Sequence, residues 1–201
     1  MLPSIVYALF THNGDLETAG DYMDAIVAQL DNVSTFAEDF STLPPQWAGK
    51  EYGDWVSPAT EANGTSGQGP KPTSGFTSAF SAVRMAQQAA EMATALGRAD
   101  AETLAAQAQD WLEKFNEAWL YNDTVGEATY DQDLQTNLAL ALALGAAPEK
   151  LRGGVRQRLL SNLESTNYHL TTGILGVRNI FDVLFDMEED SFVLAVLEQV
   201  D

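Results

Sequence analysis

Apolar residues recur every three or four positions along most of the chain, with polar residues between them. The first clear stripe follows Asp15, a residue type that caps helices, and consists of Ala19, Tyr22, Ile26, Leu30 and Val33. This spacing matches one side of a helix with about 3.6 residues per turn. We therefore predict an amphipathic helix after Asp15.

The same period predicts further helices along the chain. One stripe ends before Gly97 and consists of Phe76, Phe80, Val83, Ala86, Met92 and Leu96. The next consists of Leu104, Ala108, Trp111, Phe115 and Trp119. Later stripes consist of Leu134, Leu138, Leu142 and Leu144; Leu151, Val155, Leu159 and Leu163; Val177, Phe181 and Leu184; and Phe192, Val196 and Val200. Together with the apolar start of the chain, they predict an all-α fold of about eight helices without strands.

Two classes of connection alternate between the predicted helices. The short ones are polar turns at 13–15, 97–100, 145–148 and 188–190. The long ones span about 38–75, 121–131 and 166–173. Short turns force neighbouring helices into antiparallel pairs. Stacked side by side, such αα-hairpins would carry all long loops on one face, which the loop 38–75 would dominate.

Aromatic rings and carboxylates gather in these long loops. The first contains Trp47, Asp54 and Trp55, the second is followed by Gln135, and the third contains His169. A sugar ring stacks its apolar face on aromatic side chains, and its hydroxyls hydrogen-bond to carboxylates and amides. Loops on a rigid scaffold are also where binding residues concentrate. The long-loop face is therefore a candidate carbohydrate site.

Composition excludes several other kinds of partner and chemistry. The 201 residues include 29 Asp and Glu against 10 Lys and Arg, a formal net charge of -19. That charge repels nucleic acids and anionic membrane surfaces, and no apolar run reaches the roughly 20 residues that span a bilayer. Because the chain has no cysteine and only two histidines, we expect no thiol chemistry, no metal site and no cofactor.

The ends and glycosylation sequons leave localisation open. The apolar segment 1–10 has no basic n-region and contains Pro3, so we interpret it as a helix that enters the core rather than as a signal peptide. The sequons at Asn32, Asn63 and Asn122 would matter only in a secretory compartment.

Each candidate residue also has a purely structural interpretation. Trp111 and Trp119 lie on a helical stripe, which favours a core position. Asp54 could cap a helix or form an Asx turn, and the acidic residues at 131–133 are explained by capping of the following helix. For Trp47 and Trp55, packing and ligand stacking are equally consistent with the sequence.

Several stretches, in order and across nearly the whole chain, resemble the catalytic domain of bacterial-type α-L-rhamnosidases. The strongest are Gly53-Asp54-Trp55 and the segment from His169 to Gly176. The others lie at 7–10 with 14–15, 57–58, 95–97 with 100–101, 115–116, and 135–136 with 139–142. That family folds as an (α/α)6 barrel of six helical hairpins. The resemblance implies that residues 1–201 form about four of the six.

The resemblance also implies a reaction. The family cleaves terminal α-L-rhamnose with inversion, using one carboxylic acid to protonate the leaving oxygen and one carboxylate to activate water. Its acid lies upstream of the first matching helix and its base downstream of the last. We therefore expect no catalytic residue in this chain, no activity of the chain alone, and the remainder of the catalytic domain as its partner.

By the resemblance, the residues carried over belong to the sugar pocket. Asp54 would accept hydrogen bonds from ring hydroxyls and Trp55 would stack on the ring. Trp47, Gln135 and His169 match less securely, and the last two could instead brace loops. The alternatives are another six-hairpin glycosidase or lyase, and a non-catalytic helical-repeat scaffold that binds a glycan or protein on its long-loop face.

Overall fold

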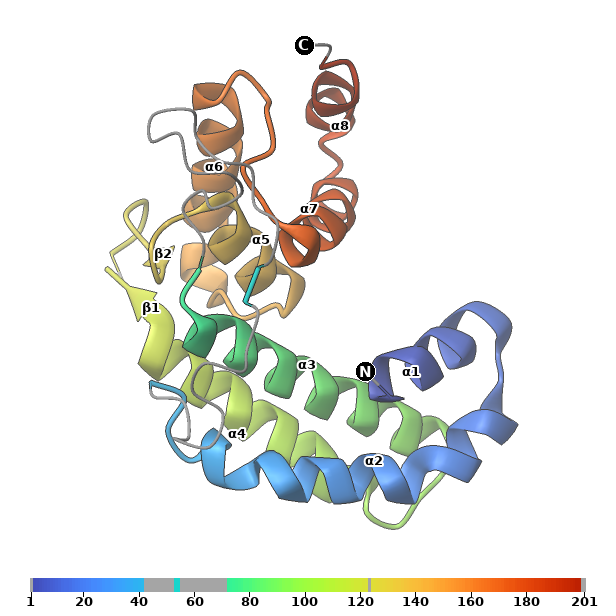
Figure 1. The fold of residues 1–201 in the computed structure, drawn as a ribbon. Coiled ribbons are helices and arrows are strands. Elements are labelled where there is room, and N and C mark those ends of the chain that lie inside the picture. Colours follow the sequence, from blue (N-terminus) through green and yellow to red (C-terminus); the bar gives the residue numbers. More distant parts are fainter. Residues whose placement is uncertain (1, 42–52, 55–71, 123, 200–201) are drawn as a thin grey trace. The chain divides into compact units, whose positions relative to one another are not determined.

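A computed structural model describes residues 2–41, 53–54, 72–122 and 124–199, so that Trp47 and Trp55 lie outside the described part. Within it the chain forms eight helices and one short hairpin (Figure 1). The helices are α1 (Leu2–Asn13), α2 (Leu16–Ala37), α3 (Ser74–Ala95), α4 (Ala101–Trp119), α5 (Gln135–Ala143), α6 (Glu149–Ser165), α7 (Ile174–Asp186) and α8 (Asp190–Leu197). This result confirms the predicted all-α class and the alternation of short and long connections.

The expectation of no strand was wrong at one place. Strand β1 (Leu120–Tyr121) pairs antiparallel with β2 (Thr129–Tyr130), and Leu120 lies opposite Tyr130. The two strands lie in the second long link, where aromatic and β-branched residues favour an extended chain. With two residues in each strand, the period of alternation was too short to be read from the sequence.

The chain divides into two compact units. Unit 1 comprises 1–42 and 79–118, and unit 2 comprises 43–78 and 119–201. Most of α3 and α4 therefore belongs to unit 1 together with α1 and α2, whereas unit 2 contains the start of α3, the hairpin and α5 to α8.

Unit 1 is built around apolar helix faces. All five residues of the predicted α4 stripe are buried, and four of them, including Trp111 at 4% exposure, belong to unit 1. On α2 the buried face consists of Ala19, Met23, Ile26 and Leu30, whereas Tyr22 is 46% exposed. The placement of Tyr22 in this core was wrong because Met23, one position further, continues the face of the helix at a spacing of four and then three residues. The ring of Phe40 packs edge-on against the ring of Trp111, with the ring centroids 6.3 Å apart.

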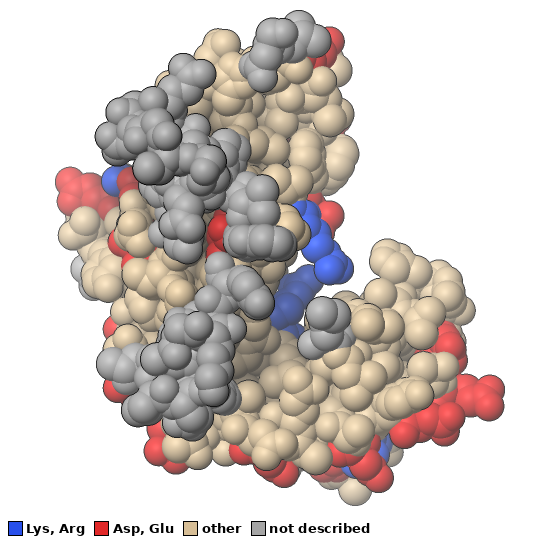
Figure 2. All heavy atoms as spheres, in the orientation of Figure 1, with Lys and Arg blue, Asp and Glu red and all other residues tan. Residues whose placement is uncertain are grey.

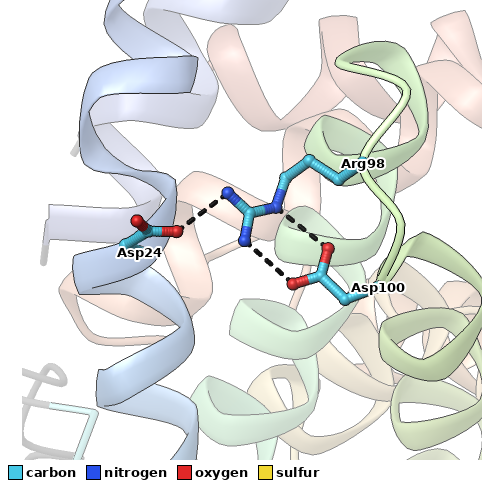
Figure 3. A network of polar contacts seen from close by, with 3 residues as sticks. All are labelled: Asp24, Arg98 and Asp100. Atoms are coloured by element: carbon cyan, nitrogen blue, oxygen red, sulfur yellow. Dashed lines mark hydrogen bonds and ion pairs between the residues drawn. The ribbon is translucent and has the colours of Figure 1, made fainter.

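Polar contacts fix the turns of unit 1. Arg98, in the turn between α3 and α4, forms two hydrogen bonds with Asp100 at 2.9 Å each and one with Asp24 of α2 at 2.8 Å (Figure 3). The hydrogen bonds to Asp100 and, to a smaller extent, to Asp24 raise the pKa of Arg98, while the guanidinium lowers the pKa of Asp100.

A further polar contact lies between α1 and α3 of unit 1. Burial, together with a hydrogen bond to Glu91, raises the pKa of Tyr7 on α1 to about 12.

Unit 2 has α5 at its centre. Every residue from Gln135 to Ala141 is buried, because α6 and α7 both pack against this helix. Helix α8 packs on α7 in turn. This central place explains why α5 has apolar residues on all sides rather than along one stripe.

The surface reflects the composition. Figure 2 shows acidic side chains on many parts of the visible face and few basic ones, in keeping with the formal net charge of -19. No helix in the described part of the chain is both long and apolar enough for a bilayer span.

Candidate functional site

Three loops meet in unit 2 at the segment that leads from β2 into α5. Asp131 contacts Thr73 at the start of α3, and Asp133 contacts Arg158 on α6. Gln135 contacts His169 in the loop 166–173, and Thr136 contacts Asp54. We call these eight residues the three-loop junction. Asp131 and Asp133 have φ angles of 46° and 61°, a conformation that is uncommon outside glycine and clusters at functional sites.

Asp54 is the most deeply buried carboxylate of the junction. It is 1% exposed and accepts hydrogen bonds from the backbone N–H groups of Gly173 at 2.7 Å, Leu175 at 2.9 Å and Gly176 at 3.0 Å. The hydroxyl of Thr136 donates a fourth hydrogen bond to the same carboxylate. Asp54 therefore caps the first turn of α7 from a distant part of the chain, which corresponds to the capping interpretation of this residue.

The residues around the Asp54 carboxylate are closely packed. A methyl group added at Gly176 would lie 2.5 Å from the Thr136 hydroxyl and 2.6 Å from Cβ of Thr172, so only glycine fits there. The buried hydroxyl of Thr172 has no hydrogen-bond partner among the residues that the structure describes.

Gln135 holds the loop before α7 at three residues. Its amide nitrogen donates to the carbonyl of His169 and to the hydroxyl of Thr166, both at 3.1 Å. Its amide oxygen accepts from the backbone N–H of Thr171 at 2.9 Å. Gln135 is fully buried and contributes to the junction by bracing this loop. Bracing was one of the two roles that the sequence left open for Gln135.

His169 lies in the same loop with its side chain exposed. Beside it, Asn167 and Tyr168 have φ angles of 51° and 64°, and the Tyr168 ring packs edge-on against Phe192 with ring centroids 5.6 Å apart. Of the predicted site residues, Asp54, Gln135 and His169 thus come together in unit 2, and Trp47 and Trp55 lie outside the described residues.

Two further carboxylates of the junction were interpreted from sequence only as caps. Asp131 accepts from the backbone N–H of Thr73, at the start of α3, at 3.0 Å, and from the amide of Asn137 at 3.2 Å. Asp133 accepts from Nε of Arg158 on α6 at 2.6 Å. This hydrogen bond raises the pKa of Arg158. No local sequence pattern predicts these partners, because Thr73 and Arg158 are 58 and 25 residues away from Asp131 and Asp133.

A cavity of about 420 Å³ lies beside α6. Gly126, Asp133, Gln157, Arg158 and Ser161 are among its lining residues. The described lining residues include no aromatic ring on which the apolar face of a sugar could stack. Among the described residues, no cluster of three or more carboxylate or imidazole groups could hold a metal ion.

Comparison with known proteins gives a consistent set of similarities. A family model described as the bacterial alpha-L-rhamnosidase 6 hairpin glycosidase domain matches residues 1–201. An alpha-L-rhamnosidase of Streptomyces avermitilis is 26% identical over 196 residues, which are 98% of this chain and 17% of that protein.

Solved structures match the same fold. The S. avermitilis alpha-L-rhamnosidase complexed with L-rhamnose superposes with a TM-score of 0.82 at 24% identity, over 97% of this chain and 17% of that chain. The alpha-L-rhamnosidase of Dictyoglumus thermophilum gives a TM-score of 0.80 at 26% identity, over 98% of this chain and 21% of that chain. This chain therefore spans about a fifth of the length of the relatives that it matches.

Proposed function

Since the chain belongs to the bacterial alpha-L-rhamnosidase six-hairpin glycosidase domain family, we propose that it forms the sugar-binding part of an α-L-rhamnosidase. The complete domain would hydrolyse terminal α-L-rhamnose from glycosides or polysaccharides. The observation that carries the proposal is the three-loop junction. In it, hydrogen bonds join loops from distant parts of the chain near the start of α7, and one of these loops contains the exposed His169.

The structural relative from S. avermitilis was solved with L-rhamnose, which supports this class of ligand. L-Rhamnose has hydroxyls on one part of its ring and an apolar 6-methyl group, so its site needs hydrogen-bonding groups and aromatic surface together. The proposed site consists of Trp47, Asp54, Trp55, Gln135 and His169. The two tryptophans would stack on the ring, and His169 would hydrogen-bond to a hydroxyl.

Hydrolysis would require two carboxyl groups on opposite faces of the sugar, one acting as acid and one as base. Two carboxylates of the junction are poor candidates for the acid or the base, because their oxygens already accept several hydrogen bonds. Asp54 accepts four hydrogen bonds, and Asp133 accepts from Arg158 and Thr129. We therefore expect the 201-residue chain alone to bind rhamnose without hydrolysing a rhamnoside.

Calorimetric titration of the 201-residue chain tests the binding proposal. L-Rhamnose should bind more tightly than L-fucose, a 6-deoxy sugar with a different arrangement of hydroxyls. His169→Ala should weaken binding about tenfold, the loss expected for one hydrogen bond of about 1.4 kcal/mol. His12→Ala is the matched control, because His12 is also exposed but lies on α1 in unit 1.

Two results would contradict the proposal. Equal affinity for the two sugars, or equal loss of affinity in the two histidine variants, would remove rhamnose recognition from the junction. Release of aryl alcohol from an aryl α-L-rhamnoside by the chain alone, at a rate typical of enzymes, would refute the expectation that the reacting carboxylates are absent.

A further inference from the structure

We infer that Asp54 is a positioning residue of the junction rather than a sugar ligand. Its carboxylate supplies the missing N-terminal cap of α7 and thereby fixes the loop 166–173 that precedes the helix. The inference rests on the proposed function only where it concerns sugar binding, because the cap itself is independent of any ligand.

The first step concerns what α7 lacks. The backbone N–H groups in the first turn of a helix have no partners within the helix, and a Ser, Thr, Asp or Asn at the N-cap position normally supplies one. In α7 the N-cap residue is Gly173, which has no side chain, and no local side chain caps the helix. Asp54 accepts hydrogen bonds from the backbone N–H groups of Gly173, Leu175 and Gly176. It therefore supplies the cap that the side chain of the N-cap residue cannot supply.

The second step concerns the capacity of the carboxylate. An ionised carboxylate has about four lone-pair positions, two on each oxygen. Oδ1 accepts from Leu175 and Gly176, and Oδ2 accepts from Gly173 and Thr136. All four positions are occupied, and the residue is 1% exposed. A sugar hydroxyl could bind Asp54 only by displacing one of these donors.

The third step links the cap to the loop. Neighbouring residues of α5 act on the same loop, since Gln135 holds it at His169 and Thr171, and Thr136 donates to the carboxylate that fixes its end at Gly173. His169 is one of these anchors through its carbonyl, and it lies in the same loop as Gly173. Loss of the Asp54 cap should therefore displace His169 through the loop, without removing any direct contact to the sugar.

Amide hydrogen exchange of the 201-residue chain, followed by NMR, tests the cap directly. Asp54→Asn keeps the size of the side chain but replaces one of its two accepting oxygens by an NH2 donor, which must face either Gly173 or the pair Leu175 and Gly176. Exchange at the amides that face this donor should become at least about tenfold faster, since hydrogen bonds to charged groups contribute about 1.5–3 kcal/mol. Asp182→Asn is the matched control, because it removes an exposed carboxylate from the same helix and should leave these rates unchanged.

A second pair of variants keeps the carboxylate and alters only its fourth donor. Thr136→Val removes the hydroxyl, whereas Thr136→Ser retains it. The valine variant should speed exchange at Gly173 and weaken L-rhamnose binding by a few-fold, and the serine variant should restore both. A role in stability alone would alter exchange in the valine variant without altering the affinity for rhamnose. The two Thr136 variants also test the positioning role if Asp54→Asn fails to fold.

The results separate this inference from the proposed function. Wild-type exchange rates at the three amides in Asp54→Asn would overturn the positioning role. So would a large change of the Asp54 carboxyl carbon resonance on saturation with L-rhamnose, which would identify Asp54 as a sugar ligand. If rhamnose does not bind at all, the proposed function fails, whereas the exchange rates still show whether Asp54 caps α7.

Discussion

In unit 1 the buried faces of α2 and α4 are apolar, whereas unit 2 buries an aspartate, a glutamine and two asparagines beside its apolar residues. Of the nine buried polar or charged residues in the described part of the chain, only Gln88 lies in unit 1. Apolar contacts require mainly the right volume, and several side chains can satisfy them. A buried polar group requires a specific partner at a specific distance. Unit 2 therefore has the kind of interaction that fixes loops in one geometry, as a binding site needs.

The largest effect should follow from a cavity in the core of unit 1. Phe115 on α4 is fully buried, and Phe115→Ala should lower the free energy of unfolding by about 3–5 kcal/mol. Urea denaturation followed by circular dichroism measures this change. A loss below about 1 kcal/mol would show that apolar packing is not what holds unit 1 together.

Loss of a buried polar brace in unit 2 should cost less overall but act on one loop. Gln135→Ala leaves the Thr171 N–H without its partner and removes one of the two donors to the His169 carbonyl, so it should lower the free energy of unfolding by about 2 kcal/mol. Exchange of the Thr171 amide should rise in parallel. Gln109→Ala, an exposed change on α4, should stay within about 0.5 kcal/mol of wild type. Equal effects of the two variants would contradict the distinction between the units.

Two glycines of unit 2 should respond to alanine with opposite signs. Gly176→Ala places a methyl group 2.5 Å from the Thr136 hydroxyl, so it should destabilise the protein by about 1–3 kcal/mol. Gly153 lies in α6 with no atom within 4 Å of an added methyl, so Gly153→Ala should stabilise by about 1 kcal/mol through helix propensity. Thermal unfolding of both variants decides this. A stabilising Gly176→Ala would contradict the close packing around Asp54.

The accuracy of the fold prediction also differs between the two units. The stripe from Leu104 to Trp119 was predicted and is buried throughout, because helical burial depends on spacing within one segment. Tyr22 was misplaced because Met23 beside it is equally apolar, so the pattern alone did not choose between them. The hairpin at Leu120 and Tyr130 was missed because its strands are too short to show a period.

The candidate site residues were predicted from the sequence, but their hydrogen-bond partners were not. Asp54, Gln135 and His169 were expected on one face, and they do meet in unit 2. The pairing of Asp54 with Thr136 joins residues 82 positions apart, and the bond to Gly176 joins residues 122 positions apart. No spacing rule connects such positions, since they meet only after α5 and α7 have packed together. The contribution of Trp47 and Trp55 stays a prediction.

The smallest effect should come from a surface ion pair of unit 1. The Arg98 guanidinium lowers the pKa of Asp100, so the folded state binds this proton less readily than the unfolded chain. The stabilisation is therefore present above the unfolded pKa of about 3.9 and is lost as pH falls through the lower folded value. Asp100→Asn should be less stable than wild type at pH 7, and the difference should vanish in acid. Urea denaturation at both pH values measures it, and a difference that persists in acid would contradict the role of the charge.

The central claim is that the three-loop junction of unit 2 binds the sugar. It is tested most directly by ¹⁵N chemical-shift mapping of the 201-residue chain during titration with L-rhamnose. We predict saturable shifts concentrated at the loop 166–173 and at Gly53 and Asp54, with unit 1 unaffected. Saturable shifts confined to α1 and α2, or to the cavity beside α6, would contradict the account, as would the absence of any saturable shift.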